Sequence, residues 1–449
     1  MKTTSTNYKF RLLARLVIEA ETPLAIGSGE KDIVTDARVI RDVNRLPYIP
    51  GTAVAGVIRS ILNVKDDDPL WGFQKKNIGR GSEIIFTEAK ILDSKGKPVD
   101  GLKDSEDIGK DPLLQNYEEL PIRQHVSITE KGVAAHTGKF DEEVVFKGTR
   151  FCFEIEIVSA NEDLNKLENL ICAVRTQTFR LGGNTRSGFG KVKVVSVKTK
   201  VLDLNTEDGL RDYLNKSSNL EDDSNWWDNV AEKDSTEIPD QDYVSYELNL
   251  QPVDFILFGS GYGDTEGNAD MTTVHENVVH EGTLNDQSLI PGTSVKGALR
   301  HRIAFHYNKI IADKEPENVA IAPKNKAVQE LFGYQDDRAH RGNTLISDVF
   351  VKPLKSELIT HVSIDRFTGG ATGGALFTEQ TDYGKGIHLS LNLQVKESVL
   401  KDKDIEKALE MALKDVCNGM LPLGGGVNRG NGIFKGVILK NGEKYYEGK

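Results

Sequence analysis

The sequence predicts an α+β fold in two tandem domains, because one set of motifs occurs twice in the same order. Ile-Pro-Gly-Thr starts at Ile49 and again at Ile290, 241 residues later. A glycine-rich segment starts at Leu181 and again at Leu423, 242 residues later. Between them, LWGFQ and HVSI of the first half are answered in order by LFGYQ and HVSI of the second half. Four ordered pairs, with offsets that differ only by loop-sized amounts (236 to 261 residues), indicate a duplicated unit of about 200 residues, the size of a domain.

The repeat fixes the expected domain boundaries. We expect a first domain at residues 1–200, a linker at 201–242 and a second domain at 243–449. The linker holds 13 acidic and 3 basic residues, and it therefore accounts for most of the net charge of −11. Both domains are then nearly neutral, so a basic face that binds phosphates remains compatible with the composition. We expect the linker to be a solvated connector with short helices, in which Trp226 and Trp227 pack against a domain or dock on a partner.

Each repeat shows the same order of predicted elements. A strand with alternating apolar residues runs into a Gly-Ser-Gly turn, and after a polar loop the Pro-Gly turn opens a helix that Thr52 or Thr293 can cap. A strand, a hairpin-like excursion, a strand, a second helix, the glycine-rich segment and a last strand follow. The predicted strands and helices lie at residues 10–20, 81–91, 163–177 in the first repeat and at 246–258, 342–351, 404–417 in the second. This order predicts a ferredoxin-like (RRM-like) sheet in each repeat.

Composition excludes several classes of protein. The chain has 449 residues, of which 38% are hydrophobic and 28% charged, enough for two cores. It has no apolar run of transmembrane length and no signal-peptide pattern at its start, so we expect a cytoplasmic protein without a membrane partner. Its three cysteines lack CxxC spacing, which argues against a disulfide framework or a zinc site and favours positions in the core.

The glycine-rich segments allow two interpretations. Glycines at such density can serve tight turns and helix caps, or can present backbone N–H groups to phosphates. A nucleotide-binding loop of the usual kind is disfavoured, because it would follow a strand and precede a helix, the reverse of the order here. Arg186 and Arg429 lie inside the two segments and favour an anionic partner.

These features together resemble the RAMP superfamily of CRISPR proteins. Residues 35–59, TDARVIRDVNRLPYIPGTAVAGVIR, are similar to the backbone subunit of type III effector complexes, and the resemblance extends over both repeats. It implies two fused backbone domains, each with a thumb-like β-hairpin insertion, near residues 131–143 and 368–375. The implied partners are a guide crRNA, complementary target RNA and other CRISPR effector subunits. Base pairing with the guide would then select the target, as in other RNA-guided effectors.

The resemblance also implies a catalytic residue. In the family a loop aspartate between the first strand and the Ile-Pro-Gly turn assists cleavage of target RNA, and Asp36 occupies that place. We expect Asp36 to hold Mg²⁺, or another divalent cation such as Mn²⁺, while the RNA 2′-OH attacks the adjacent phosphate. In the second repeat the loop is nine residues longer, so counting is ambiguous. Asp270 is the predicted equivalent, and Glu276, next to His275, is the alternative.

Further residues are expected to contact RNA. They come from the first helix of each repeat, the glycine-rich segments and the hairpins, and Ala53 and Ala55 make the first repeat's helix the weaker candidate. The predicted RNA-binding residues are Thr52, Arg59, Arg123, His125, Gly182, Gly183, Arg186, Thr293, Ser294, Lys296, Arg300, Arg366, Phe367, Gly425 and Arg429.

Two other functions remain open from the sequence. One is a metal-independent endoribonuclease of the same superfamily that processes the guide precursor. The other is a scaffold subunit that binds RNA without cutting it.

Overall fold

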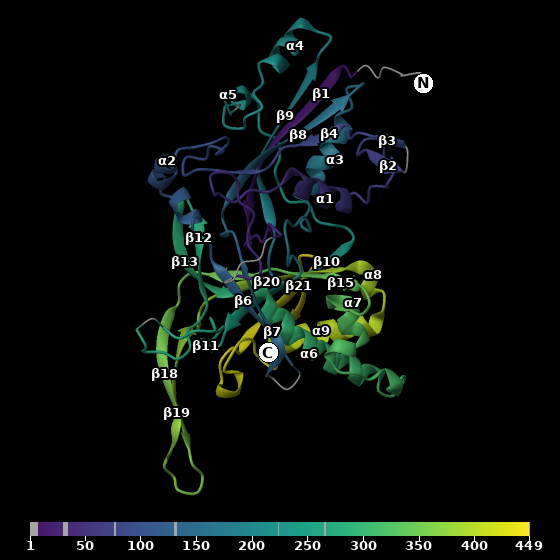
Figure 1. Ribbon diagram of the computed structural model, residues 1–449. Coiled ribbons are helices and arrows are strands. Elements are labelled where there is room, and N and C mark those ends of the chain that lie inside the picture. The colour runs from purple at the N-terminus through teal and green to yellow at the C-terminus, as the bar shows by residue number, and fades with distance from the viewer. Residues whose placement is uncertain are drawn as a thin grey trace.

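The computed structural model describes residues 8–29, 35–75, 78–129, 133–222, 224–264 and 266–448. Two α+β repeats lie one above the other, the first in purple to teal and the second in green to yellow (Figure 1). This arrangement confirms the predicted fold class.

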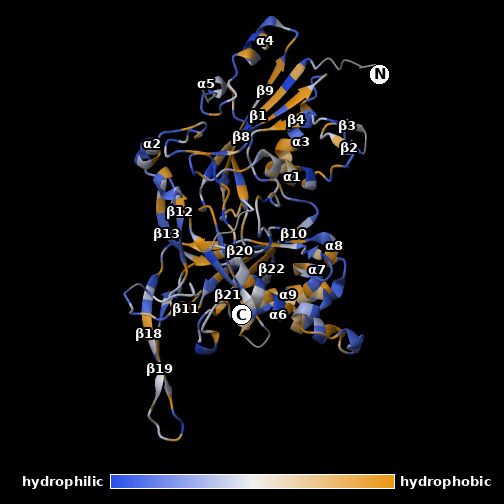
Figure 2. Ribbon diagram, in the orientation of Figure 1, coloured by the Kyte–Doolittle hydropathy of each residue, from blue (hydrophilic) through white to orange (hydrophobic). Residues whose placement is uncertain are grey.

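The first repeat is built on one antiparallel sheet with the strand order β4-β8-β1-β9. Its strands are β1 (Phe10–Ala20), β4 (Ile84–Phe86), β8 (Arg150–Ser159) and β9 (Val192–Asp203), and β5 (Lys90–Ile91) also pairs with β8. Helices α1 (Gly51–Ile61) and α3 (Leu164–Arg175) contribute to the core on the sheet. This is the ferredoxin-like order that the sequence predicts. Figure 2 shows the apolar residues concentrated in these strands.

The second repeat has the equivalent sheet with one strand added at its edge. The order is β16-β20-β10-β21-β22. The strands are β10 (Tyr243–Pro252), β16 (Thr344–Ile346), β20 (Leu389–Lys396), β21 (Phe434–Lys440) and β22 (Glu443–Glu447), and the helices that pack on them are α6 (Gly292–Ile311) and α9 (Lys403–Cys417). A separate core lies between these helices and the sheet.

The first helix of each repeat starts one residue earlier than the predicted cap. Helices α1 and α6 begin at Gly51 and Gly292, and neither has a side-chain cap from the residue before it. Thr52 and Thr293 are therefore helical residues, which corrects the predicted capping role. Instead, Asp348 accepts a hydrogen bond from the backbone N of Gly292, 2.7 Å away. A carboxylate at this position satisfies a free N–H group and interacts favourably with the helix dipole.

Each repeat carries a long hairpin between its second and third sheet strands. In the first repeat β6 (Ile122–Ile128) pairs with β7 (Ala134–Glu143), and in the second β18 (Lys355–Ile364) pairs with β19 (Ala371–Tyr383). The second hairpin projects away from the body of the molecule (Figure 1). The predicted first excursion starts at Lys131, which lies outside the described residues.

Each repeat places one hairpin against the other repeat. The β6–β7 hairpin of the first repeat reaches the second repeat, where Arg123 contacts Glu276. In return β12 (His275–His280) and β13 (Thr283–Ile290) of the second repeat send Val279 and Leu284 against the first repeat's core. The two domains therefore contact each other through a hairpin from each of them.

The linker packs on the first repeat. Strand β9 runs to Asp203, three residues past the expected boundary, and α4 (Glu207–Leu214) and α5 (Ser224–Trp227) follow. Trp227 is 1% exposed, and its Nε1 donates to Glu154 at 2.7 Å. The linker is therefore anchored on the first repeat through Trp227, while most of its described residues are exposed.

Short elements complete the chain. They are β2 (Phe73–Lys75), β3 (Ile78–Arg80), α2 (Ser105–Lys110), η1 (Leu114–Tyr117), β11 (Phe255–Ile256), η2 (Pro316–Asn318), η3 (Ala322–Lys324), α7 (Lys326–Phe332), β14 (Gly333–Gln335), β15 (Ala339–Arg341), β17 (Val349–Val351), α8 (Glu397–Leu400) and η4 (Val427–Arg429). Across the described ranges, none of the helices combines the length and apolar character needed to cross a membrane.

Candidate nucleic-acid interface

Asp36 lies on an exposed loop that runs along the hairpin strand β7. The backbone N of Asp36 donates to Asp141 Oδ1 at 2.9 Å, and the backbone N of Asp141 donates to Asp36 Oδ2 at 3.2 Å. Ala37 then pairs with Glu142 in a parallel bridge. The carboxylate is thus held at a defined place on the surface. Asp42, in contrast, accepts from the backbone N of Asn44 and Leu46 and closes a turn.

Asp270 occupies the corresponding place in the second repeat. Its backbone N donates to the carbonyl of Thr378 at 2.8 Å, and its Oδ2 accepts from the backbone N of Thr378 at 2.8 Å. Met271 then pairs with Glu379 in a parallel bridge, as Ala37 does with Glu142. The register of the two bridges resolves the counting ambiguity in favour of Asp270.

The alternative residue Glu276 is buried at the interface between the repeats. It is 5% exposed and pairs with Arg123, which also bonds Asp348 Oδ2 at 2.9 Å. Burial disfavours the charge of Arg123, but the two carboxylates outweigh it and raise its pKa. Glu276 is therefore an interface residue, and the prediction that Arg123 contacts RNA is corrected: its guanidinium joins the repeats.

Sequence patterns did not identify Asp141 as a neighbour of Asp36. Asp141 is separated from Asp36 by 105 residues, and only the pairing of the loop with β7 brings the two carboxylates together. In the second repeat Thr378 takes the equivalent place, so the two sites differ by one carboxylate. A period-two pattern in the hairpin could have placed Asp141 on the same face as Gln124, but not beside Asp36.

Three cations from both repeats converge beside the start of α6. Arg186 comes from the first glycine-rich segment, while Lys296 and Arg300 lie one turn apart on α6. The Nζ of Lys296 donates to Ser187 Oγ at 3.2 Å, and Arg186 donates through Nε to the carbonyl of Gly342. None of the three forms an ion pair within the part of the chain that the structure describes, and the buried Nε of Arg300 has no hydrogen-bond partner there.

Burial is the main cause that shifts the pKa values of these cations downward, and neighbouring cations add to the shift for Lys296 and Arg186. Burial, then Arg300 and Arg186, lowers the pKa of Lys296 to about 8. Burial, then Arg341, lowers the pKa of Arg186 to about 10, and burial lowers the pKa of Arg300. Positive charges held together without carboxylates disfavour one another, so an anion bound among them would relieve this cost. We call Arg186, Lys296 and Arg300 the cation cluster.

The first repeat has a weaker version of this feature. Ala55 stands where the second repeat has Lys296. Arg59, the equivalent of Arg300, lies 3.8 Å from Asp66 and donates to the carbonyl of Lys65 at 3.4 Å. Thr52 and Ser294 are exposed and Thr293 is half-buried at their helix starts.

The paired glycines serve packing. The backbone N of Gly183 donates to the carbonyl of Ala25 at 2.7 Å, and that of Gly425 donates to the carbonyl of Leu257 at 2.6 Å. Gly182 has φ of +86°, and a Cβ there would lie 2.5 Å from the carbonyl oxygen of Ala25. The N–H groups of Gly183 and Gly425 therefore bond protein, which supports the turn-and-packing interpretation, whereas Gly182 and Gly183 are exposed and the RNA contact of these glycines stays a prediction.

Two further predicted RNA contacts are occupied by protein. His125 is 8% exposed and lies beside Glu142, and Arg429 pairs with the buried Glu379. The buried His125 belongs to an internal cluster, which corrects its assignment to RNA, whereas the Arg429 side chain is 33% exposed and its contact with RNA stays a prediction.

Arg366 and Phe367 do not lie at the base of the second hairpin, where the sequence predicted them. They lie in the turn between β18 and β19, at the tip of the hairpin rather than at its base. Phe367 is 88% exposed, with the guanidinium of Arg366 5.3 Å from the centre of its ring. An exposed aromatic–arginine pair of this kind is suited to stacking on a base.

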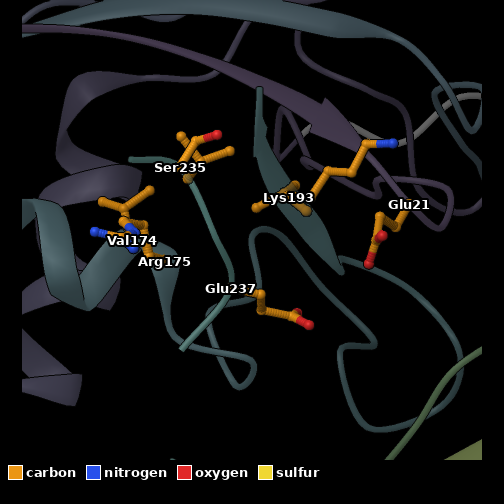
Figure 3. A pocket seen from close by; sticks show the side chains of 8 residues that line it. Glu21, Val174, Arg175, Lys193, Ser235 and Glu237 are labelled. Carbon is orange, nitrogen blue, oxygen red and sulfur yellow. The ribbon is translucent and has the colours of Figure 1, made fainter. Parts of the chain in front are cut away.

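A cavity of about 190 Å³ lies between the linker and the first repeat. Glu21, Arg175, Lys193 and Glu237 line it, together with four other residues (Figure 3). Lys191 pairs with both Glu21 and Glu237, and Arg175 pairs with Asp234. Because these charges are already compensated by protein groups, the cavity is a less suitable anion site than the cation cluster.

Comparison with known proteins supports the arrangement. The chain matches the model of the RAMP superfamily over residues 17–193 and 250–435, one segment in each repeat. It is also 28% identical over 207 residues to the CRISPR system Cms endoribonuclease Csm3 of Methanocaldococcus jannaschii, an alignment that covers 42% of this chain and 81% of that relative. The chain therefore belongs to the RAMP superfamily, with one superfamily domain in each repeat.

Proposed function

We propose that this protein is a guide-RNA-binding backbone subunit of a type III CRISPR effector and that it cleaves complementary target RNA. The cation cluster carries the RNA-binding part of this proposal. Its three side chains come from two domains and have no carboxylate partner among the described residues, which is the arrangement expected for a phosphate of an RNA backbone. Similarity to a CRISPR endoribonuclease supports the same assignment.

The cleavage part rests on Asp36 and Asp270. Both carboxylates are exposed, at equivalent places beside the two hairpins. A hairpin that displaces one nucleotide would align the RNA 2′-OH with the adjacent phosphate, and positioning of this kind supplies much of a rate enhancement. The carboxylate would then assist deprotonation or hold a divalent cation.

The oxygen donors fit a sparsely held Mg²⁺ or Mn²⁺. Asp36 and Asp141 lie together, whereas the described residues contain no group of three or more potential ligands. Mg²⁺ commonly binds through one or two carboxylates and keeps several waters. When bound, the cation would stabilise negative charge on the phosphate.

Guide binding gives the first test. We expect Lys296→Ala and Arg300→Ala each to weaken guide RNA binding and to reduce the slope of log Kd against log salt concentration by about 0.7. Filter binding at several salt concentrations measures this. The matched control is Arg211→Ala, which removes an exposed cation from α4, and an effect of the cluster variants no larger than the control's would contradict the assignment.

The lowered pKa of Lys296 predicts a pH dependence of guide binding. The phosphate requires the protonated ammonium, which the free protein loses as pH rises through about 8. We therefore expect Kd to rise about 10-fold between pH 7 and pH 9. The Lys296→Ala variant should bind more weakly but show little of this change, whereas an equal pH dependence in both proteins would assign the titration to another group.

Cleavage assays with the guide-bound protein separate the alternative functions. A precursor-processing enzyme would cut repeat-derived precursor RNA in EDTA, and a scaffold would bind guide and target without any cut. A target cut that requires a divalent cation supports the proposal.

A further inference from the structure

Each repeat buries one glutamate at the base of its hairpin, and the proposed mechanism does not use either residue. Glu142 of β7 is 5% exposed and Glu379 of β19 is 1% exposed. Burying a carboxylate is costly unless other groups pair with it. Each glutamate directly follows the hairpin residue that exchanges hydrogen bonds with Asp36 or Asp270.

In the first repeat Glu142 joins the hairpin to the glycine-rich segment. Asn184 donates through Nδ2 to both carboxylate oxygens, at 2.7 and 2.8 Å. The Nε2 of His125, from the opposite hairpin strand, lies 2.8 Å from Oε1, although this contact does not have hydrogen-bond geometry. The ring of His125 stacks on Phe140 with centroids 4.7 Å apart.

The second repeat builds the same cluster with a different loop residue. Arg429 of the glycine-rich segment pairs with Glu379, and the Nε2 of His361 lies 3.0 Å from its Oε2. His361 stacks on Phe377 with centroids 4.9 Å apart. The repeated element is therefore a buried glutamate, a stacked histidine and one polar side chain from the glycine-rich segment.

The residue that follows each glutamate also binds the loop that bears the aspartate, through its backbone. Next to Glu142, the N of Glu143 donates to the carbonyl of Ala37 at 2.9 Å, and next to Glu379, the N of Gln380 donates to the carbonyl of Met271 at 2.8 Å. The glutamate side chain fixes this stretch of hairpin against the glycine-rich segment. The same stretch then fixes the loop that presents Asp36 or Asp270.

We propose that Glu142 and Glu379 are positioning residues that set the orientation of the Asp36 and Asp270 carboxylates toward the RNA. The inference rests on the proposed function, since it assigns the two glutamates to the cleavage step. It predicts that each glutamate affects only the cut made by its own repeat. Guide binding should be independent of both, because the cation cluster is made of other residues.

The test uses the whole chain assembled with guide and target RNA. We expect Glu142→Ala to slow the first repeat's cut between 10- and 100-fold in single-turnover reactions, since a displacement of about 1 Å can cost about 100-fold. The second repeat's cut and the Kd for guide should stay unchanged, and Glu379→Ala should show the reverse pattern. Glu142→Gln keeps an acceptor for Asn184 and should lie between Glu142→Ala and the unmodified chain. The surface variant Glu207→Ala, on α4, is the control.

Two further variants distinguish positioning from general destabilisation. Asn184→Ala removes only the loop's contacts to Glu142 and should slow the same cut. In an Asp36→Asn background that retains a measurable rate for the first cut, adding Glu142→Ala should slow that cut little further, because Glu142 acts through Asp36. If the residual rate is undetectable, the selective loss of one cut in Asn184→Ala carries the test.

The outcomes are separable. Equal slowing of both cuts by Glu142→Ala, or no slowing of the first, overturns the inference while the proposed function stands. An unmodified complex that binds guide but makes no cut overturns the proposed cleavage and the inference with it. If only the second repeat fails to cut, the inference is overturned for Glu379, and guide Kd remains the control for Glu142.

Discussion

Asp36→Ala is expected to abolish one of two target-RNA cuts while guide binding and complex assembly remain intact. The carboxylate is exposed on a loop, so its removal should change the free energy of unfolding by no more than about 0.5 kcal/mol. The cut should be lost because the proposed reaction depends on this group beside the displaced nucleotide. End-labelled target RNA annealed to guide with Mg²⁺, resolved on a denaturing gel, measures both cuts.

Asp270→Ala is the reciprocal variant and should remove only the other cut. The two products should differ in length by one backbone step. A cut that persists at full rate in Asp36→Ala would show that the assignment is wrong. If Asp270→Ala loses neither cut, the second repeat binds RNA without cutting it.

Arg123→Ala is expected to give the largest loss of stability among the substitutions considered. The substitution leaves Glu276 and Asp348 buried without their cation, which typically costs about 3–5 kcal/mol. Asp348 also holds the first N–H group of α6, so the disturbance should extend to that helix. Urea unfolding measures the change.

The control for this prediction is Arg211→Ala, whose ion pair with Glu207 is exposed and should contribute little. Arg123→Lys keeps the charge but not the two-pronged geometry and should recover only part of the loss. A change for Arg123→Ala as small as the control's would mean that the repeats are held together by other contacts.

The hairpins show how far local sequence reasoning reaches. The paired His-Val-Ser-Ile motifs marked the repeat in the sequence, and in the structure they form the end of β6 and of β18, the first strand of each hairpin. His125 was predicted to contact RNA, but it is buried beside Glu142. Which face of a hairpin strand meets protein depends on the partner strand and on the glycine-rich segment, which lie far away in the sequence.

The charged residues show the same limit. An arginine in the sequence carries a charge but no indication of its counterion. Among the residues that the structure describes, Arg123 and Arg429 pair with carboxylates, whereas Arg186, Lys296 and Arg300 do not. The latter three are the better candidates for a phosphate, and the sequence motifs alone do not separate the two groups.

The sequence by itself determined the duplication and the ferredoxin-like order in each repeat, because these follow from spacing and periodicity within each repeat, and Asp36 was predicted from the resemblance to the RAMP superfamily. The tertiary structure alone decided the equivalence of Asp270, the neighbouring carboxylate of Asp141 and the cation cluster between the repeats. The physical reason is that the free energy of a charged side chain is set by which groups share its desolvated surroundings. Those groups are brought together by strand pairing and domain contact across more than one hundred residues.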